Sequence, residues 1–380
     1  MMTMKAYIAG VGHTRFGQWK ESLTEMMGEA AQAALDSISS KKASVDALLV
    51  GTMNPAQFTG EDNIAANITD RLGLNPMPAF RIENAPASGS AALHQAIFAI
   101  SAGMFHSVLV LAGEKMSQIS TKMMSKYIAH LTPKEERVSG ATMPGLVAMM
   151  ARRYMYEHSL SREDLALVPV KSHNCASHNP HAHFHKSITV DDVLSSPLVA
   201  DPLRLYDCAP ISDGACGVVV TADKSDVEIA GFAHGADALY YQHRSSISNF
   251  PVTGRTAHKA YEMAGVAPEK IDVVETHDAF SILELINTED LGLFGRGESI
   301  KALKSGATGV EGDVPVNPSG GLKAKGHPLG ATGLAQVCEL YWQLVSEAGR
   351  RQVDGAEIGL AHNMGGFGNN AAVTILRKVQ

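Results

Sequence analysis

Apolar and polar positions along the first part of the chain predict alternating strands and helices. A short apolar stretch at Ala6–Val11 predicts a strand, the amphipathic stretch Leu23–Ile38 predicts a helix, and Ala47–Val50 predicts a second strand. Farther along, Ser107–Ala112 is apolar without alternation, which is typical of a strand buried on both faces. The order of strand, helix and strand is that of an α/β protein with a parallel sheet.

A long stretch in the first half interrupts this pattern. From Gly113 to about Pro202 the chain carries methionines, histidines and mixed charge, and its periodicity is weak except for a helix predicted near Gly145–Glu157. The strand pattern resumes at Asp213–Ala222. We therefore interpret residues 113–202 as an insertion.

The second half of the chain repeats short motifs of the first half in the same order. Ala9-Gly10 returns as Ala230-Gly231, Val45–Val50 as Ile271–Val274, Ala87-Ser88-Gly89 as Ala331-Thr332-Gly333, and Gly217–Thr221 as Ala371–Ile375. The interval between the last two motifs is about ninety residues longer in the first half, which locates the insertion independently. We infer two copies of one α/β unit, over residues 1–225 and 226–380, with the insertion in the first copy.

The most distinctive segment is Asn317–Leu334, which reads N-P-S-G-G-L-K-A-K-G-H-P-L-G-A-T-G-L and leads into a stretch of helical periodicity. Glycine-rich backbone allows a ligand to approach closely, and His327 stands just ahead of the predicted helix. His327 is therefore the first catalytic candidate. An incidental histidine in a glycine-rich turn is the alternative.

Composition narrows the classes of function. Asp and Glu outnumber Lys and Arg by 39 to 32, so no basic field indicates a nucleic-acid partner. Met1–Gly12 lacks the apolar core of a signal peptide, and no apolar run is long enough to span a membrane. The four cysteines form no C-x-x-C pair, which suits a reducing compartment. We expect a cytoplasmic protein.

Three motifs resemble those of the thiolase superfamily, most closely its sterol-carrier-protein-type and archaeal branch. They are the block Asn317–Gly333, the pair His277-Asp278 after an apolar strand, and the run His362–Gly368 (H-N-M-G-G-F-G). The resemblance covers essentially the whole chain. It implies the thiolase fold, a duplicated five-layer αβαβα arrangement with an inserted loop domain and buried helices at Pro86–Ala102 and Gly330–Leu344. It also implies acyl-CoA ligands and a homodimer or homotetramer.

The resemblance implies roles for individual residues. His327 corresponds to the imidazole that activates the nucleophile and helps to form the oxyanion hole for the thioester carbonyl, and His277 would position a water or donor in the same hole. Asn363 lies where degradative and biosynthetic thiolases place a second, acid/base cysteine. Gly365 aligns with a backbone donor of a second oxyanion hole. Ser319, Gly320 and Gly321 are expected, with His327, to line the cleft for the CoA thioester.

The position of the nucleophile departs from the family pattern. In Asn84–Gly89 (N-A-P-A-S-G) this chain has Pro86 where the family has a cysteine. Proline has neither a thiol nor a backbone N–H, so the acyl-enzyme and one oxyanion-hole donor are both lost. The substitution is structurally mild, because proline is well tolerated in the first turn of a helix. For Ser88 and Cys208, the neighbours that could replace the thiol, a structural role is the preferred interpretation.

A group of histidines in the insertion could indicate a metal site; its members are His173, His178, His181, His183 and His185. No cysteine or carboxylate stands at a recognised ligand spacing from them, and the family uses no metal. We expect a packed or solvated loop and no metal.

Two functions remain open. The first is an enzyme that retains His327 and His277, abandons the covalent step, and acts on C–C bonds next to a CoA thioester by aldol or retro-aldol chemistry. Relatives of this kind often have a small OB-fold partner protein; acyl-CoA would be a substrate, with no permanently bound cofactor. The second is a catalytically silent subunit that binds acyl-CoA or scaffolds a partner enzyme. The two histidines favour the first, and the lack of a clear base, for which His362 is a candidate, favours the second.

Overall fold

The computed structural model describes residues 5–38 and 44–379, so Met1–Met4 of the N-terminal stretch considered above lie outside it. The elements of the first half are β1 (Tyr7–His13), α1 (Leu23–Asp36), β2 (Ala47–Gly51), α2 (Pro55–Thr59), α3 (Ile64–Arg71), β3 (Ala79–Ile82), α4 (Ser88–Ser101), β4 (Ser107–Glu114) and β7 (Gly214–Thr221). The strands and the helix predicted at the start of the chain are confirmed, with ends shifted by at most two residues.

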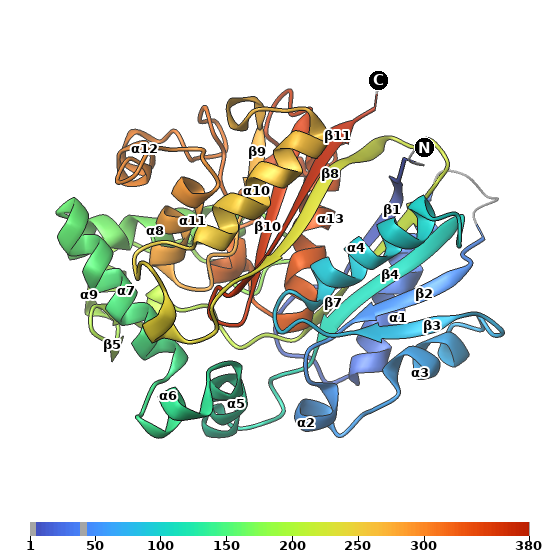
Figure 1. Ribbon diagram of the computed structural model, residues 1–380, viewed down its shortest axis with the longest axis horizontal. Coiled ribbons are helices and arrows are strands. Elements are labelled where there is room, and N and C mark those ends of the chain that lie inside the picture. The colour runs from blue at the N-terminus through green and yellow to red at the C-terminus, as the bar shows by residue number, and fades with distance from the viewer. Residues whose placement is uncertain (1–4, 39–43, 380) are drawn as a thin grey trace.

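The second half contains a similar series of elements. They are β8 (Val227–Ala236), α10 (Pro251–Ala264), β9 (Val273–Glu275), α11 (Ser281–Asp290), α12 (Ser299–Ser305), α13 (Thr332–Leu344), β10 (Ile358–Gly365) and β11 (Asn370–Lys378). In Figure 1 they run from yellow to red, beside the blue strands of the first half.

The two halves have the same strand order. Outward from their junction, the first half runs β1, β7, β4, β2, β3, and the second runs β8, β11, β10, β9, beyond which Val316 pairs with Val274. In each half the first two pairings are antiparallel and the third is parallel. The duplication inferred from short motifs is thus present in the topology. The boundary placed at residue 225 falls between β7 and β8, and the domain limits themselves stay a prediction.

The repeated Ala-Gly pair has a physical explanation. The strand register shifts at Ala9 in β1 and at Ala230 in β8, so both strands bulge at the same place in the repeat. A Cβ on Gly10 would lie 2.5 Å from the carbonyl oxygen of Ala34 in α1, and one on Gly231 would lie 2.4 Å from that of Ala260 in α10. Glycine is needed at both positions because an outer helix packs directly on the strand.

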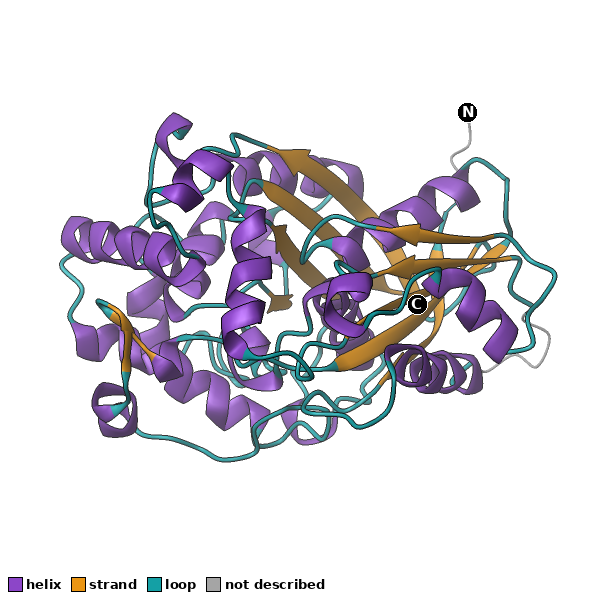
Figure 2. Ribbon diagram, turned by 90° about the horizontal axis from the view of Figure 1, so that it is seen from below, coloured by secondary structure: helices purple, strands orange, loops and turns teal. Residues whose placement is uncertain are grey.

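The helices α4 and α13 lie between the two groups of strands in Figure 1, and Figure 2 shows that helices pack on both sides of the strands. Alternate residues of the strands point to two different cores. In β7, Val218 and Val220 pack in the core around α4 and α13, whereas Val219 packs in a core with α1 and α3. On the far side, Val373 and Ile375 of β11 pack with α10. The predicted five-layer αβαβα fold is confirmed, and the unalternating strands follow from burial on both faces.

The insertion forms the helices drawn in green in Figure 1 and a small hairpin: α5 (Thr121–Ile128), α6 (Lys134–Val138), α7 (Met143–His158), α8 (Arg162–Ala176), α9 (Val190–Ser195), β5 (Leu198–Ala200) and β6 (Leu203–Arg204). Of these, the sequence predicted only α7. The long helix α8 escaped detection because Pro169 lies inside it and because its buried side includes Ser172 and His173, so the apolar periodicity is lost. Among the described residues, no helix is long and apolar enough to cross a membrane.

Candidate functional site

A cavity of about 630 Å³ lies where the insertion meets both halves of the fold, and we call it the histidine cavity. Pro86, His277 and His327 are among its lining residues, together with side chains from α5, α7 and the segment that follows β10. None of the described lining residues is charged, and most are apolar. Both histidines named by the sequence are therefore brought together in one mostly apolar space, which is the usual character of a small-molecule site.

The His327 ring is buried and held from one side. Its Nδ1 lies 2.7 Å from the Oγ1 of Thr332, and the Thr332 hydroxyl donates to the carbonyl of Pro328 at 3.1 Å. Because that hydroxyl has one proton, Nδ1 is assigned as the donor to Thr332, and Nε2 is left with its lone pair. Burial lowers the pKa of His327 to about 3, so the ring is neutral at pH 7.

In the His277 ring, the donor and acceptor roles of the two nitrogens are reversed. Its Nδ1 accepts from the backbone N–H of Met364 at 3.3 Å and lies 3.2 Å from the amide nitrogen of Asn363. Both partners are donors, so Nδ1 is the acceptor and Nε2 carries the proton. Burial, with His327 and His362 nearby, lowers the pKa of His277 well below its usual value. The two ring centroids are 5.1 Å apart with the planes nearly perpendicular.

The pair offers one proton acceptor and one proton donor to a single cavity. The partners on Nδ1 of each ring leave Nε2 of His327 as a lone pair and Nε2 of His277 as an N–H. Asn363 is buried and orients His277; it is not among the lining residues, although the position was expected to be part of the reacting site.

Pro86 lines the cavity from a tight turn two residues ahead of α4, which begins at Ser88 rather than at Pro86 as expected. The turn places Ala85 at φ 51°. The Ser88 Oγ donates to the Ala85 carbonyl at 2.7 Å and accepts from the Asn84 N–H at 2.9 Å. Ser88 is fully buried and its hydroxyl is committed to the backbone, which agrees with a structural role.

Cys208 also lines the cavity, but its thiol is poorly suited to nucleophilic attack. Burial, together with Asp207, raises the pKa of Cys208 to about 12. A thiol with this pKa stays protonated at pH 7, and the protonated thiol is the unreactive form.

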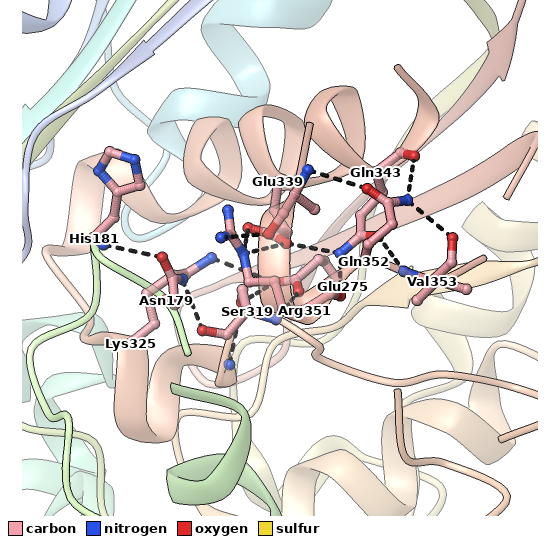
Figure 3. A network of polar contacts seen from close by, with 12 residues as sticks. Asn179, His181, Glu275, Ser319, Lys325, Glu339, Gln343, Arg351, Gln352 and Val353 are labelled. Carbon is pink, nitrogen blue, oxygen red and sulfur yellow. Dashed lines mark hydrogen bonds and ion pairs between the residues drawn. The ribbon is translucent and has the colours of Figure 1, made fainter. Parts of the chain in front are cut away.

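Ser319, Gly320 and Gly321 lie elsewhere. They are not among the lining residues, so this cavity does not meet the expectation that they line the ligand cleft. The Ser319 hydroxyl donates to Glu275 at 2.7 Å, within the buried network of polar side chains drawn in Figure 3. A Cβ on Gly320 would lie 2.5 Å from that of Ala176, and one on Gly321 would lie 2.2 Å from a carboxylate oxygen of Asp278. Protein atoms therefore approach both glycines closely.

The network in Figure 3 explains how the glycine-rich segment is held. Lys325, two residues before His327, lies 3.3 Å from Glu275, and the backbone N–H of Ser319 donates to the other oxygen of that carboxylate at 3.1 Å. Glu275 ends β9 and is fully buried. The segment that delivers His327 is therefore anchored to the sheet by a buried charged pair.

Gly365 lies at the end of β10, against the turn that carries Pro86. A Cβ at this position would lie 2.9 Å from the Asn84 carbonyl oxygen, so glycine allows the two segments to meet. Its role as an oxyanion-hole donor stays a prediction.

His362, considered as a base, has no access to the cavity. It is fully buried, with Nδ1 2.9 Å from the hydroxyl of Thr276 and Nε2 3.3 Å from that of Thr253. Both ring nitrogens are thus occupied by hydroxyl groups, and His362 is excluded from the candidate bases.

Three of the histidines of the insertion have separate partners. The His181 ring stacks on Trp342 with centroids 5.0 Å apart, the His183 Nδ1 lies 2.9 Å from the Ser212 hydroxyl, and the His173 Nδ1 lies 3.0 Å from the Lys186 carbonyl. Within residues 5–38 and 44–379, no group of three or more His, Cys, Asp or Glu residues could hold a metal ion.

Sequence reasoning missed two kinds of residue at this site. One is Thr332, which fixes the His327 ring and lies in the G-A-T-G sequence directly after Gly-His-Pro. The other is the apolar lining from the insertion, including Met124, Met143 and Val147. Its methionine-rich texture was a signal, since methionine is common at adaptable binding surfaces.

Comparisons with known proteins show the family of the chain. A model of the thiolase N-terminal domain matches residues 6–224, and a thiolase C-terminal domain-like model matches residues 233–378. An acetyl-CoA acetyltransferase of Methanothermobacter thermautotrophicus is 44% identical over 98% of this chain and 99% of its own. Sterol carrier protein 2 of Gallus gallus is 32% identical over 99% of this chain and 72% of its own.

A solved structure described as an Ltp2-ChsH2(DUF35) aldolase has the same fold. Its TM-score is 0.84 at 24% identity, with 99% of this chain and 98% of that chain covered. The matched family models together span most of the chain, and two relatives exceed 30% identity to it over at least 98% of its length. On this basis, the chain belongs to the thiolase family.

Proposed function

We propose that the chain acts on a carbon–carbon bond next to the carbonyl of a CoA thioester, by aldol or retro-aldol chemistry and without a covalent acyl-enzyme. The observation that carries this proposal is the pair of buried, neutral imidazoles of His277 and His327, which line one apolar cavity beside Pro86. Acyl-CoA is then a substrate, and no permanently bound cofactor is invoked.

The two histidines have the complementary roles that such a reaction needs. With a 3-hydroxyacyl-CoA, Nε2 of His327 takes the proton of the 3-hydroxyl group, and the bond between C2 and C3 breaks. C3 becomes the carbonyl of a released aldehyde or ketone, and the electron pair of the bond forms the thioester enolate. The N–H of His277 donates to the enolate oxygen, and protonated His327 returns its proton to C2, which gives the shorter acyl-CoA.

The turn at Pro86 supports a reaction without an acyl-enzyme. Pro86 has no nucleophile, the Ser88 hydroxyl is bonded to the backbone, and burial raises the pKa of the Cys208 thiol to about 12. Aldol and retro-aldol steps need an enolate and a proton carrier but no acyl-enzyme.

A second candidate is a catalytically silent subunit that binds acyl-CoA or scaffolds a partner enzyme. One observation favours it: burial lowers the pKa of His327 to about 3, which makes the neutral ring a weak base in the unliganded protein. A silent acyl-CoA-binding subunit shares the ligand with the enzyme and differs in that the ligand is not converted, whereas a scaffold needs no ligand.

Under either candidate we place the protein in the cytoplasm as a homodimer or homotetramer, with a small OB-fold protein as its partner. The family membership and the aldolase structure with its named DUF35 component support a partner of this kind.

The test is a panel of 3-hydroxyacyl-CoA and 3-ketoacyl-CoA thioesters, with and without a co-purified partner, analysed by mass spectrometry. Retro-aldol activity gives an aldehyde or ketone together with a shorter acyl-CoA, whereas thiolysis consumes free CoA. Binding detected by calorimetry without any product supports the silent subunit. Absence of both binding and product under all conditions rejects the enzyme and the acyl-CoA-binding subunit, and leaves only a scaffolding role.

The covalent step has its own measurement. Incubation with acetyl-CoA is expected to leave the intact mass of the protein unchanged, because Pro86 offers no nucleophile. An acetyl group mapped to Cys208 or Ser88 would show that another residue has replaced the family's cysteine, and would reject the non-covalent mechanism.

A further inference from the structure

One wall of the histidine cavity is entirely apolar. We call it the Met124 wall and define it by the lining residues Met116, Met124, Ile128, Leu131, Ile211 and Leu329. These side chains belong to one hydrophobic cluster, which also includes Met53 and Phe58 and is separate from the cores of the sheets. Met116 and Met124 are almost fully buried, at 2% and 1% exposure.

One residue of the Met124 wall is close in sequence to the reacting centre. Leu329 is two residues after His327, and both line the same cavity. The hydroxyl groups of the cavity lining belong to Thr121, Ser125 and Thr142, outside this wall. A group attached to the reacting carbons therefore has an apolar surface beside it.

The chemistry of the wall discriminates between the two parts of an acyl-CoA. The pantetheine arm carries two amide groups, which lose hydrogen bonds with water when they are placed against a surface without polar partners. The same placement stabilises an alkyl or aryl group, because its apolar surface is removed from water. Methionine side chains adapt to irregular shapes, which suits a bulky substituent.

We infer that the substrates are CoA thioesters with a large, uncharged, apolar acyl group that packs on the Met124 wall. This inference rests on the proposed function for the identity of the ligand as a CoA thioester. It excludes short acyl groups as preferred ligands, and it excludes acyl groups that end in a carboxylate, because none of the described lining residues offers a cation.

The experiment is calorimetry with acetyl-CoA, hexanoyl-CoA and decanoyl-CoA. A fourth ligand is a dicarboxylic acyl-CoA with the same chain length as decanoyl-CoA. Affinity for the wild-type protein is expected to rise by up to about fourfold for each methylene that reaches the wall. The dicarboxylic thioester should bind more weakly than decanoyl-CoA. Equal affinity for all three chain lengths would overturn the inference.

A pair of neighbouring methionines supplies the variant and its control. Met124 lines the cavity, whereas Met123 on the same helix is 38% exposed and does not. Met124→Trp fills the space and should abolish the gain in affinity with chain length, so that decanoyl-CoA loses more affinity than acetyl-CoA. Met123→Trp should behave as the wild type.

Two further outcomes separate the explanations. If Met124→Trp weakens free CoA as strongly as decanoyl-CoA, the wall contacts the pantetheine arm and the inference is wrong. If Met124→Trp fails to fold, Met124→Gln keeps the volume and adds a polar group, and it should still lower the affinity for decanoyl-CoA more than for acetyl-CoA. Binding needs no turnover, so affinity that increases with chain length without any retro-aldol product would retain this inference and reject the proposed reaction.

Discussion

The turns that lead into the two buried helices occupy equivalent places in the duplicated fold. Only one of them presents a side chain that can transfer a proton. Ahead of α4, the turn presents Pro86 to the cavity; ahead of α13, the segment after Gly326 presents His327. A hydroxyl stabilises both: Ser88 bonds to the Ala85 carbonyl, and Thr332 bonds to the Pro328 carbonyl and contacts the His327 ring. The scaffold is repeated, and single side chains decide which copy can do chemistry.

The largest expected effect comes from removing the imidazole of the second turn. His327→Ala should lower the rate of retro-aldol cleavage by about 10²–10⁴, the usual contribution of a proton-transferring group. Pro86→Ala, a change of the cavity-lining residue in the first turn, should alter the rate by less than about threefold, because neither proline nor alanine has a reactive side chain. Single-turnover rates of product formation provide the comparison. Similar losses in both variants would contradict it.

Most of the fold could be predicted from the sequence, because burial on both faces of strands and short repeated motifs are local signals. The pair Ala9-Gly10 and Ala230-Gly231 is the clearest case, since a bulge under a closely packed helix requires those residues in both halves. The helix α8 could not be predicted in this way, because Pro169 and buried polar side chains remove its periodicity.

The site was only partly predictable, for a different reason. His277 and His327 were identified from motifs, but the direction in which a side chain or backbone faces is decided by tertiary packing. Gly320 and Gly321 indicate that other atoms approach the backbone closely. The sequence does not show that these atoms belong to Ala176 and Asp278. In the same way, Asn363 and His362 lie in a recognisable motif, yet both turn out to be buried behind the cavity.

The second prediction concerns stability, and it compares the same two turns. The folded-state pKa of His327 is about 3, below the ordinary value of 6.5 that applies to the unfolded chain. A histidine whose pKa is lowered by folding contributes its full stability above about pH 6.5. That contribution is lost as the pH falls towards 3, because the unfolded state binds the proton. Between about pH 8 and pH 5 the loss should be about 2 kcal/mol.

Chemical denaturation at both pH values measures this loss. His327→Gln cannot bind the proton, so its free energy of unfolding should fall by about 2 kcal/mol less than that of the wild type. Pro86→Ala changes no titrating group and should show the wild-type dependence on pH. An unchanged dependence in His327→Gln would mean that the ring is accessible to protons in the folded protein.

A third, smaller effect separates the functions of the two hydroxyls. Thr332→Val removes the partner of the His327 Nδ1, which frees the ring to change tautomer, and should lower the rate by about tenfold, equivalent to about 1.4 kcal/mol. Thr332→Ser should restore most of the rate. Ser88→Ala should cost about 1–3 kcal/mol of stability with an unchanged rate per folded molecule, because its hydroxyl bonds only to backbone groups. Rates and unfolding free energies of all three variants distinguish an effect on the imidazole from an effect on the fold.

The smallest expected effect is a gain of covalent reactivity with acetyl-CoA. Pro86→Cys gives the first turn a thiol and a backbone N–H at the cavity lining, next to two histidines that can accept and donate protons. Incubation with acetyl-CoA should then add an acetyl group to Cys at position 86 in a small fraction of molecules, detected by intact mass and peptide mapping. The fraction should stay small, because Asn363 cannot act as the second acid/base group of family members that have a cysteine there. Adding Asn363→Cys should increase turnover, although it also removes the amide that contacts the His277 Nδ1. If both variants fold and bind CoA thioesters but acquire no acetyl group, the histidines are not arranged for catalysis. The second turn is then as inactive in catalysis as the first.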